Sequence, residues 1–471
     1  MRLRPIIIAA FAALLALGVL AGPALASHGE VAFFEAPENL LGVPADYQAK
    51  TLSRLQSLGV HALRVTLYWR KVAPKPGHQH RPRFNQANPA SYDWGEYDLL
   101  ISRAVAMHWT VLLTVTGPVP RWATPHGEDR YSYPNTTDFE QFMTAVGRHY
   151  GRTVKLFSIW NEPNQPGFLR PQYVKHKLVS PEIYRGLYLA GYLGLKHSGN
   201  FRGMKVLMGE TSAIGVGSAE VPAPLAFLRG LLCLNAHYRP VGRCAELPTS
   251  GWAQHPYANS RGPFGSPPAD DVTIGTLGRL VTALDKAGAA RRIPRNLPVY
   301  ITEFGVQSVP DPIVGVPVAK QAEYDAMGER LAWSNPRIAS FSQYLLQDDH
   351  PRGGKVVGFQ SGLETYKGRH KPLYQGFRLP LTVSRTRYGV SFWGLVRPAS
   401  ARTSVILQYS SNGGRSWHGL ATEHTSASGY WHGTGVFARG RLWRVDWVSP
   451  AGTTYLGAPI RAYTASGAIA R

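Results

Sequence analysis

The chain has 471 residues, a formal net charge of +22 and only two cysteines. This length exceeds that of a typical single domain of about 100–200 residues, so we expect one large domain and a smaller one. The positive charge favours anionic partners, but the basic residues form neither a dense run nor a known reading motif, so nucleic-acid binding is not expected. An acidic polysaccharide, an anionic cell wall or a host with generally basic proteins would each explain the charge equally well.

The first 26 residues have the pattern of a secretory signal peptide. Arg2 and Arg4 form a basic end, an apolar run extends from Ile6 to Leu20, and Ala24-Leu25-Ala26 offers small residues for cleavage. We therefore expect residues 1–26 to be removed and the protein to be secreted or cell-surface associated, with no membrane span after removal. An uncleaved N-terminal anchor is the alternative, because the apolar run is near the lower limit for a spanning helix.

Eight short β-branched or apolar runs recur along residues 27–380, separated by segments with helical periodicity. From the second run onward the spacing is roughly 40–50 residues, which fits a repeated strand, helix and two loops and so predicts a (β/α)8 TIM barrel. The competing layout, a doubly wound open sheet, needs a Gly-rich phosphate turn after an early strand, and the sequence has none. The predicted strands are 31–34, 63–69, 111–116, 156–160, 206–208, 251–257, 299–304 and 338–345, and the predicted helices include 47–58, 97–107, 181–195, 321–333 and 371–379.

Residues 381–471 differ in character from the preceding chain. They carry ten arginines against two acidic residues, a net charge of +8. The alternating runs 405–409 and 442–448, with a turn at Asn412-Gly413-Gly414, predict a small antiparallel β-sandwich domain. Its tryptophans are either a sugar-binding platform or core residues: Trp393, Trp417, Trp431, Trp443 and Trp447.

The two cysteines, Cys233 and Cys244, are the only residues available for a disulfide. An exported chain meets oxidising conditions in which such a pair tends to close a loop, so a disulfide is expected. Two buried free thiols are the alternative.

Two of the predicted strands lead into a glutamate. The fourth ends in Trp160-Asn161-Glu162-Pro163-Asn164, and the seventh ends in Ile301-Thr302-Glu303-Phe304-Gly305. The C-terminal strand ends of a barrel converge on one face, where catalytic groups collect. Two carboxylates in one cleft are what glycosidic cleavage needs, since one protonates the leaving oxygen and the other attacks the anomeric carbon or activates water.

These motifs resemble those of the clan A glycoside hydrolases, the superfamily that includes families five and thirty-nine. The resemblance covers roughly residues 30–380 and implies a retaining enzyme that cleaves β-glycosidic bonds, with Glu162 as acid/base and Glu303 as nucleophile. Arg64 resembles the clan's arginine near the nucleophile, and His255-Pro256-Tyr257 resembles its strand-six motif. The resemblance also implies that Asn161 hydrogen-bonds the sugar 2-hydroxyl.

Each supporting residue also has a structural interpretation. Arg64 could form an ion pair, Asn161 could cap a turn, and His255 and Tyr257 could be buried polar residues that bind only protein.

Physical chemistry assigns different charge states to the two glutamates. A general acid must hold its proton, so Glu162 needs a pKa raised by burial and by the charge of Glu303. Arg64 and the Tyr257 hydroxyl favour the ionised form of Glu303. When Glu303 is esterified its charge disappears, and Glu162 can then act as a base toward water. This retaining mechanism predicts carboxyl groups about 5–5.5 Å apart.

The sugar pocket departs from the clan's pattern at two strands. The clan often ends strand eight in a tryptophan, whereas this chain has Phe341-Ser342-Gln343-Tyr344, so Tyr344 or Gln343 takes that place. Strand three lacks the histidine of some members and offers Thr116-Gly117-Pro118. Trp69, Trp122 and Trp160 lie near strand ends and are candidates for stacking on sugar rings, with barrel packing as the alternative.

The expected partner is a poly- or oligosaccharide, with an anionic or cell-wall glycan among the candidates, and no cofactor is expected. Asp348-Asp349-His350 follows no metal-ligand spacing, so we predict a solvated loop there and no metal site. Two other functions are compatible with the sequence. One is a carbohydrate- or cell-wall-binding protein with a degenerate hydrolase site, and the other is a transglycosylase that uses the same residues.

Overall fold

The computed structural model describes residues 30–350, 358–467 and 470 of the chain. The predicted signal peptide, residues 1–26, lies outside the described residues. Within the described ranges, none of the helices has both the length and the apolar character that crossing a bilayer requires.

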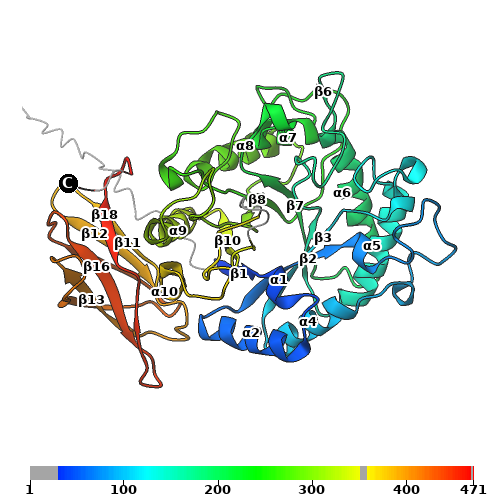
Figure 1. Ribbon diagram of the computed structural model, residues 1–471. Helices are drawn as coiled ribbons and strands as arrows, with labels where there is room; N and C mark the ends of the chain where they lie inside the picture. The colour runs from blue at the N-terminus through cyan, green and yellow to red at the C-terminus, as the bar shows by residue number, and fades with distance from the viewer. Residues whose placement is uncertain (1–29, 351–357, 468–469, 471) are drawn as a thin grey trace, which may run out of the picture.

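Eight parallel strands form a closed barrel in the order β1-β10-β9-β8-β7-β4-β3-β2 (Figure 1). They are nearly continuous apolar runs because helices cover the outside of the barrel while side chains fill the inside. All eight overlap the predicted strands, so the (β/α)8 prediction is confirmed. The strands are β1 (Val31–Glu35), β2 (Ala62–Tyr68), β3 (Thr110–Thr116), β4 (Leu156–Ile159), β7 (Lys205–Ser212), β8 (Gly251–His255), β9 (Val299–Ile301) and β10 (Ile338–Tyr344).

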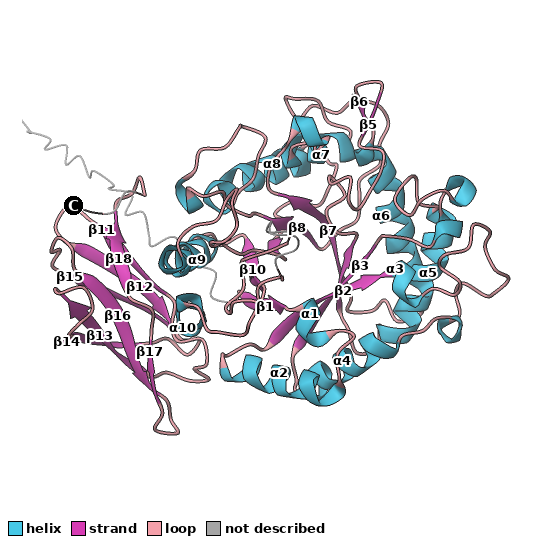
Figure 2. Cartoon of the chain, in the orientation of Figure 1, coloured by secondary structure: helices cyan, strands magenta, loops and turns pink. Residues whose placement is uncertain are grey.

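The helices form a ring around the barrel (Figure 2). α5 illustrates how such a helix forms and packs. The Asn135 side chain caps its first turn, and its buried face carries Phe139, Phe142 and Val146. A short hairpin of β5 (Tyr173–Val174) and β6 (Lys177–Leu178) lies between β4 and α6. The helices are α1 (Pro37–Leu40), α2 (Ala45–Ser57), α3 (Trp69–Val72), α4 (Gly95–Ala106), α5 (Thr136–Tyr150), α6 (Ser180–His197), α7 (Pro224–Leu231), α8 (Leu277–Ala289), α9 (Val318–Trp333) and α10 (Pro372–Arg378).

The inside of the barrel changes from apolar to polar along the strands. Near the N-terminal ends the inward-facing layer is a cluster of buried residues that includes Phe33, Ala62, Leu112, Leu156, Leu207, Ala253 and Tyr300. Side chains that point the same way recur every second residue of a strand. Two positions further along four of these strands, the inward residues are therefore Glu35, Arg64, Thr114 and His255, all buried. This polar layer lies directly beneath the C-terminal mouth of the barrel.

The C-terminal β domain is one curled sheet. Its strands run in the order β14-β13-β16-β18-β11-β12-β15, with β17 paired to β16. All pairings are antiparallel except that of β11 with β18, and the two end strands, β14 and β15, contact each other, so the sheet is nearly closed. The strands are β11 (Leu381–Arg385), β12 (Val390–Leu395), β13 (Ser404–Ser410), β14 (His418–His424), β15 (Tyr430–Gly435), β16 (Leu442–Val448), β17 (Thr454–Leu456) and β18 (Ile460–Tyr463).

Four of the five tryptophans in this domain are core residues. Trp393, Trp431, Trp443 and Trp447 are all at most 3% exposed, and only Trp417 is partly accessible. The structure therefore supports packing, and not sugar binding, for these four side chains.

A buried junction joins the β domain to α9. Arg397 donates two 2.8 Å hydrogen bonds, one to each carboxylate oxygen of Glu329. Trp333 of α9 packs against Trp393, with ring centroids 5.8 Å apart. The barrel and the β domain share one continuous hydrophobic core.

Cys233 and Cys244 are joined by a disulfide. It closes a loop in the connection between α7 and β8, far along the chain from either glutamate motif. The predicted pairing is confirmed.

Candidate active site

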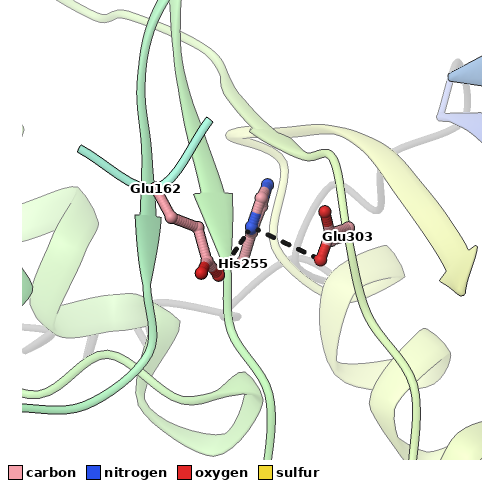
Figure 3. Close-up of side chains that lie close together, drawn as sticks. All are labelled: Glu162, His255 and Glu303. Atoms are coloured by element: carbon pink, nitrogen blue, oxygen red, sulfur yellow. Dashed lines mark hydrogen bonds and ion pairs between the residues drawn. The ribbon is translucent and has the colours of Figure 1, made fainter. Parts of the chain in front are cut away.

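Glu162 and Glu303 face each other across the C-terminal mouth of the barrel (Figure 3). Glu162 follows β4, Glu303 follows β9, and their side chains are 16% and 11% exposed. One oxygen of each carboxylate and one ring nitrogen of His255 all lie within 4.8 Å of one another. At least one pair of carboxylate oxygens is therefore closer than the gap of about 6.5–9.5 Å that an inverting enzyme leaves for water, which favours the closer arrangement of about 5–5.5 Å in retaining glycosidases.

The backbone that carries Glu162 has an unusual conformation. Trp160 and Glu162 have φ angles of 73° and 38°, and Glu210 at the end of β7 has a φ of 48°. Such left-handed conformations cost roughly 1–3 kcal/mol each and persist only where the surroundings hold them. Here the Asn161 N–H donates to the Thr116 hydroxyl at 3.0 Å, and the Glu162 N–H donates to the Glu210 carbonyl at 3.0 Å. Strands β3 and β7 thus hold the loop that carries Glu162 from both sides.

Arg64 is the central cation of the site, and all five of its N–H donors are used. Nη1 donates to Glu303 at 2.6 Å and also to Glu35. Nη2 donates to the Asn161 side chain at 2.6 Å and to Glu210 at 2.8 Å. The fifth donor, Nε, is 3.2 Å from the Thr114 hydroxyl. One buried cation is thus shared by three carboxylates.

Both residues of the strand-six motif lie against the glutamates of the site. His255 is fully buried, and its Nδ1 lies 3.0 Å from Glu162 and 3.6 Å from Glu303. Its Nε2 lies 3.9 Å from Glu210. The Tyr257 hydroxyl donates to Glu303 at 2.9 Å. The structure therefore brings Arg64, Asn161, His255 and Tyr257 around the two carboxylates.

Burial raises the pKa of both glutamates, but different neighbours oppose this effect at each of them. Burial raises the pKa of Glu162, and the charge of Glu303 raises it further, while the contact with His255 lowers it. Burial also raises the pKa of Glu303, but Arg64 and the Tyr257 hydroxyl both favour its carboxylate form. Direct bonding to Arg64 makes Glu303 the better candidate for the ionised partner, and Glu162 the better candidate for the protonated one.

Sequence reasoning missed Glu35 and Glu210, which complete the coordination of Arg64. Glu35 is the last residue of β1, and its other oxygen accepts from the Thr66 hydroxyl at 2.8 Å. Glu210 lies within β7 and accepts from the Thr114 hydroxyl at 2.9 Å. Each falls just past a predicted strand, the same signal that identified Glu162 and Glu303, and could have been found by it.

Glu35 gives the folded protein a pH-dependent loss of stability. Burial, with a smaller contribution from the charge of Glu303, raises the pKa of Glu35 to about 7 from its ordinary value of 4.5, although Arg64 and Thr66 oppose the shift. Between these two values the unfolded chain releases a proton that the folded protein keeps, so stability falls as pH rises through this window. We expect the Tm of the wild type to fall more between pH 5 and pH 8 than that of Glu35→Gln, as measured by calorimetry.

Glu128, an exposed carboxylate, provides the matched control for this measurement. Glu128→Gln should keep the wild-type difference in Tm between the two pH values. Equal differences in the wild type and Glu35→Gln would contradict the assignment.

Replacing Glu210 with glutamine is expected to weaken catalysis without unfolding the barrel. The change removes a charge from Arg64 but keeps an oxygen that can accept its hydrogen bond. A hydrogen bond to a charged group is worth about 1.5–3 kcal/mol, so kcat/KM should fall about 10–100-fold. The loss should be similar for good and poor leaving groups, because Arg64 contacts Glu303 and not Glu162. Kinetics on a series of aryl glycosides checks this, and a fall in Tm with unchanged kcat/KM would show a purely structural role.

The tryptophans predicted near strand ends lie in the core. Trp69 is fully buried, and its ring stacks on Phe142 at 5.1 Å and meets Trp122 edge-on at 5.8 Å. Trp122 is 6% exposed, and Trp160 is fully buried against Phe139. Of the two interpretations that the sequence allows for these residues, the structure supports packing over contact with sugar.

Tyr344 ends β10 and lies on the Glu303 side of the site. Burial raises its pKa, and the charge of Glu303 contributes next, which places the hydroxyl within electrostatic range of that carboxylate. Its ring meets Phe359 edge-on at 4.9 Å, and Phe359 lies 5.6 Å from the Tyr257 ring. Tyr257, Phe359 and Tyr344 together form an aromatic wall beside Glu303.

Two groups of the described residues bear on metal binding. Glu162, His255 and Glu303 are close enough to hold a cation, but Arg64 already donates to Glu303, and a second cation there would meet its positive charge. Asp348 is buried and paired with Lys371 at 2.8 Å, so the solvated loop predicted for it is wrong.

No protein-family model matches the chain. A family 39 glycoside hydrolase from the gut symbiont Bacteroides cellulosilyticus superposes with a TM-score of 0.52 at 15% identity, covering 91% of this chain and 80% of that one. A family 5, subfamily 18 enzyme from Streptomyces cattleya, solved with GlcNAc, superposes with a TM-score of 0.51 at 15% identity, covering 75% and 79%. The resemblance to clan A is thus confirmed at the level of the fold.

A curated relative matches part of the chain. It is beta-glucosidase 47 of Arabidopsis thaliana, 27% identical over 147 residues, which are 29% of this chain. The match spans only 23% of the plant protein's length.

Proposed function

We propose that this protein is a retaining glycoside hydrolase that cleaves β-glycosidic bonds by double displacement. The observation that carries the proposal is the pair Glu162 and Glu303, held within 4.8 Å with different surroundings. The glycosidase fold and the partial match to a plant beta-glucosidase support the same reaction class.

In the first step Glu303 attacks the anomeric carbon while Glu162 donates its proton to the leaving oxygen. Arg64 and Tyr257 hold the two oxygens of Glu303, so the carboxylate is fixed in direction before the sugar binds. Fixing the nucleophile in advance lowers the entropic part of the activation barrier of this first step. The glycosyl ester that forms has no charge on Glu303.

In the second step Glu162 removes a proton from water, which attacks the glycosyl ester. The ester no longer carries the charge that raises the pKa of Glu162, so Glu162 becomes able to act as the base. Nδ1 of His255, 3.0 Å from Glu162, can donate to the carboxylate in this state. The acid and the base are thus the same residue at two stages.

Substrate binding uses groups that the protein leaves available. Asn161 accepts from Arg64 through its oxygen, and among the described residues none accepts from its Nδ2, which therefore suits the sugar 2-hydroxyl. The aromatic wall of Tyr257, Phe359 and Tyr344 offers ring surface to the sugar beside the nucleophile. The substrate is a β-linked poly- or oligosaccharide, and export by residues 1–26 would bring the enzyme to it outside the cell.

The test is turnover of p-nitrophenyl β-glucoside, β-xyloside, β-mannoside and β-N-acetylglucosaminide by the protein without residues 1–26. Proton NMR of the first-formed sugar should show the β anomer, because two displacements restore the starting configuration. Release of the α anomer first would exclude the retaining mechanism. Absence of turnover across these glycosides and their oligosaccharides would contradict the hydrolase function.

A further inference from the structure

Six arginines of the β domain lie at one end of its sheet. Arg385 ends β11 and pairs with Val390 at the start of β12, which pairs with Gly435 at the end of β15. Ser410 at the end of β13 pairs with Leu442 at the start of β16, and β18 lies between β11 and β16. The loops 386–389, 411–417 and 436–441 therefore leave the sheet at the same end. We name this surface the arginine rim: Arg385, Arg387, Arg415, Arg439, Arg441 and Arg444.

The arginines of the rim form no ion pair within the described part of the chain, although the charge of Asp446 acts on Arg444 without direct contact. Across the described ranges, no carboxylate lies within 4.0 Å of any of the six guanidinium groups. By contrast, Arg397 and Arg461 of the same domain pair with Glu329 and Glu323 of the barrel. Six like charges at one edge repel one another, which a folded domain tolerates more readily when an anionic partner neutralises them.

Aromatic rings lie against four of these arginines. Arg387 lies 5.2 Å from the centre of the Tyr388 ring. Arg385 lies 4.1 Å from the centre of the Phe437 ring, Arg441 lies 4.2 Å from Tyr409, and Arg444 lies 4.2 Å from Trp417. A guanidinium that lies over a ring keeps its edge available, and that edge matches carboxylate, sulfate or phosphate oxygens with two parallel hydrogen bonds. Residues 381–471 contain no lysine. A lysine ammonium group could not form the two parallel hydrogen bonds that a guanidinium edge forms.

A cavity of about 310 Å³ extends the rim toward the barrel. Arg330 of α9 and Arg385 both line it, together with Ser334 and Ser384, and no acidic side chain is among its lining residues. Arg330 donates to the Ser384 hydroxyl, and burial lowers its pKa, as expected for a cation without a carboxylate partner. The cavity therefore suits a single anionic group next to the rim.

We propose that the arginine rim binds an acidic polysaccharide through its carboxylate or sulfate groups and holds the barrel on that polymer. A polysaccharide is favoured over a nucleic acid because guanidinium groups already cover one face of each of the rings of Phe437, Tyr409, Trp417 and Tyr388, which leaves those faces unable to stack on bases. Binding at the rim is independent of cleavage and is measured without turnover.

The experiment compares two triple variants of the protein without residues 1–26. One removes exposed rim charges by Arg387→Gln, Arg415→Gln and Arg439→Gln. The control removes the same number of exposed charges from the barrel by Arg152→Gln, Lys196→Gln and Arg202→Gln. Dissociation constants are measured by calorimetry for polygalacturonate and heparin, with neutral dextran as a blank, at about 0.05 and 0.2 M salt.

We expect the wild type to bind both acidic polymers, the rim variant to bind at least about tenfold more weakly with a smaller salt dependence, and the control to stay within about twofold. Equal weakening of both variants would show a general charge effect and overturn the proposal. So would tighter binding of single-stranded DNA or of phosphatidylserine vesicles than of either polysaccharide, or no binding at all. None of these results bears on glycoside hydrolysis, which the aryl glycosides test separately.

Discussion

Glu303→Gln is expected to lower kcat at least about 10,000-fold on every substrate, because the variant lacks the oxygen nucleophile of the first displacement. The amide keeps the size of the side chain, its one oxygen can still accept from Arg64, and its NH2 group can donate to the Tyr257 hydroxyl, so the site should remain folded. The loss should not depend on the leaving group, since no leaving group substitutes for a nucleophile. Steady-state kinetics on 2,4-dinitrophenyl and p-nitrophenyl β-glycosides measures it.

The Glu128→Gln variant serves again as the control, because Glu128 is exposed and lies outside the site. It should keep wild-type kcat, and both variants should keep the wild-type Tm within a few degrees. If Glu303→Gln retains more than about a tenth of the wild-type kcat, Glu303 is not the nucleophile.

Glu162→Ala is expected to have an effect that grows with the basicity of the leaving group. General acid catalysis contributes about 100–10,000-fold, and a leaving group that departs as a stable anion does not need it. The first step on 2,4-dinitrophenyl glycosides should therefore be nearly unchanged, while unactivated oligosaccharides should lose about 100–10,000-fold in kcat/KM. The second step also slows because the base is missing, so glycosyl-enzyme should accumulate and azide should accelerate its breakdown.

Mass spectrometry of the intact variant detects the accumulated ester, and kinetics with and without azide measure the acceleration. Asn164→Ala is a suitable control, since Asn164 is fully buried on the same loop and bonds Ser212 without contacting either carboxylate. An equal loss on activated and unactivated substrates in Glu162→Ala would remove Glu162 from the acid role.

The barrel could be predicted from the sequence because its strands are short apolar runs with regular spacing. All eight runs lie where strands are found, and the two glutamate motifs were visible because each follows such a run. The disulfide followed from two cysteines in a chain that the sequence predicts to be exported. Each of these inferences depends on local pattern alone.

The rest of the site depends on which side chains point inward at the same height, and that is set by the register of the closed barrel. Glu35 and Glu210 follow predicted strands as Glu162 and Glu303 do, but their contact with Arg64 depends on how β1 and β7 are placed around it. Trp69 was ambiguous for the same reason, since a tryptophan at a strand end can face either the mouth or the surrounding helices. The curling of the C-terminal strands into one nearly closed sheet likewise depends on pairings between distant segments.

Arg64 links most strands of the barrel to one another, and it also binds three carboxylates of the candidate active site. Its own strand is β2, and its five partners come from β1, β3, β7 and the segments that follow β4 and β9. Six of the eight barrel strands therefore contribute to the contacts of one side chain. If any of these strands moved away from the others, the arrangement of the carboxylates around Arg64 would be lost. Catalytic competence is for that reason a direct measure of whether the barrel is closed, and the two should be gained and lost as a single event.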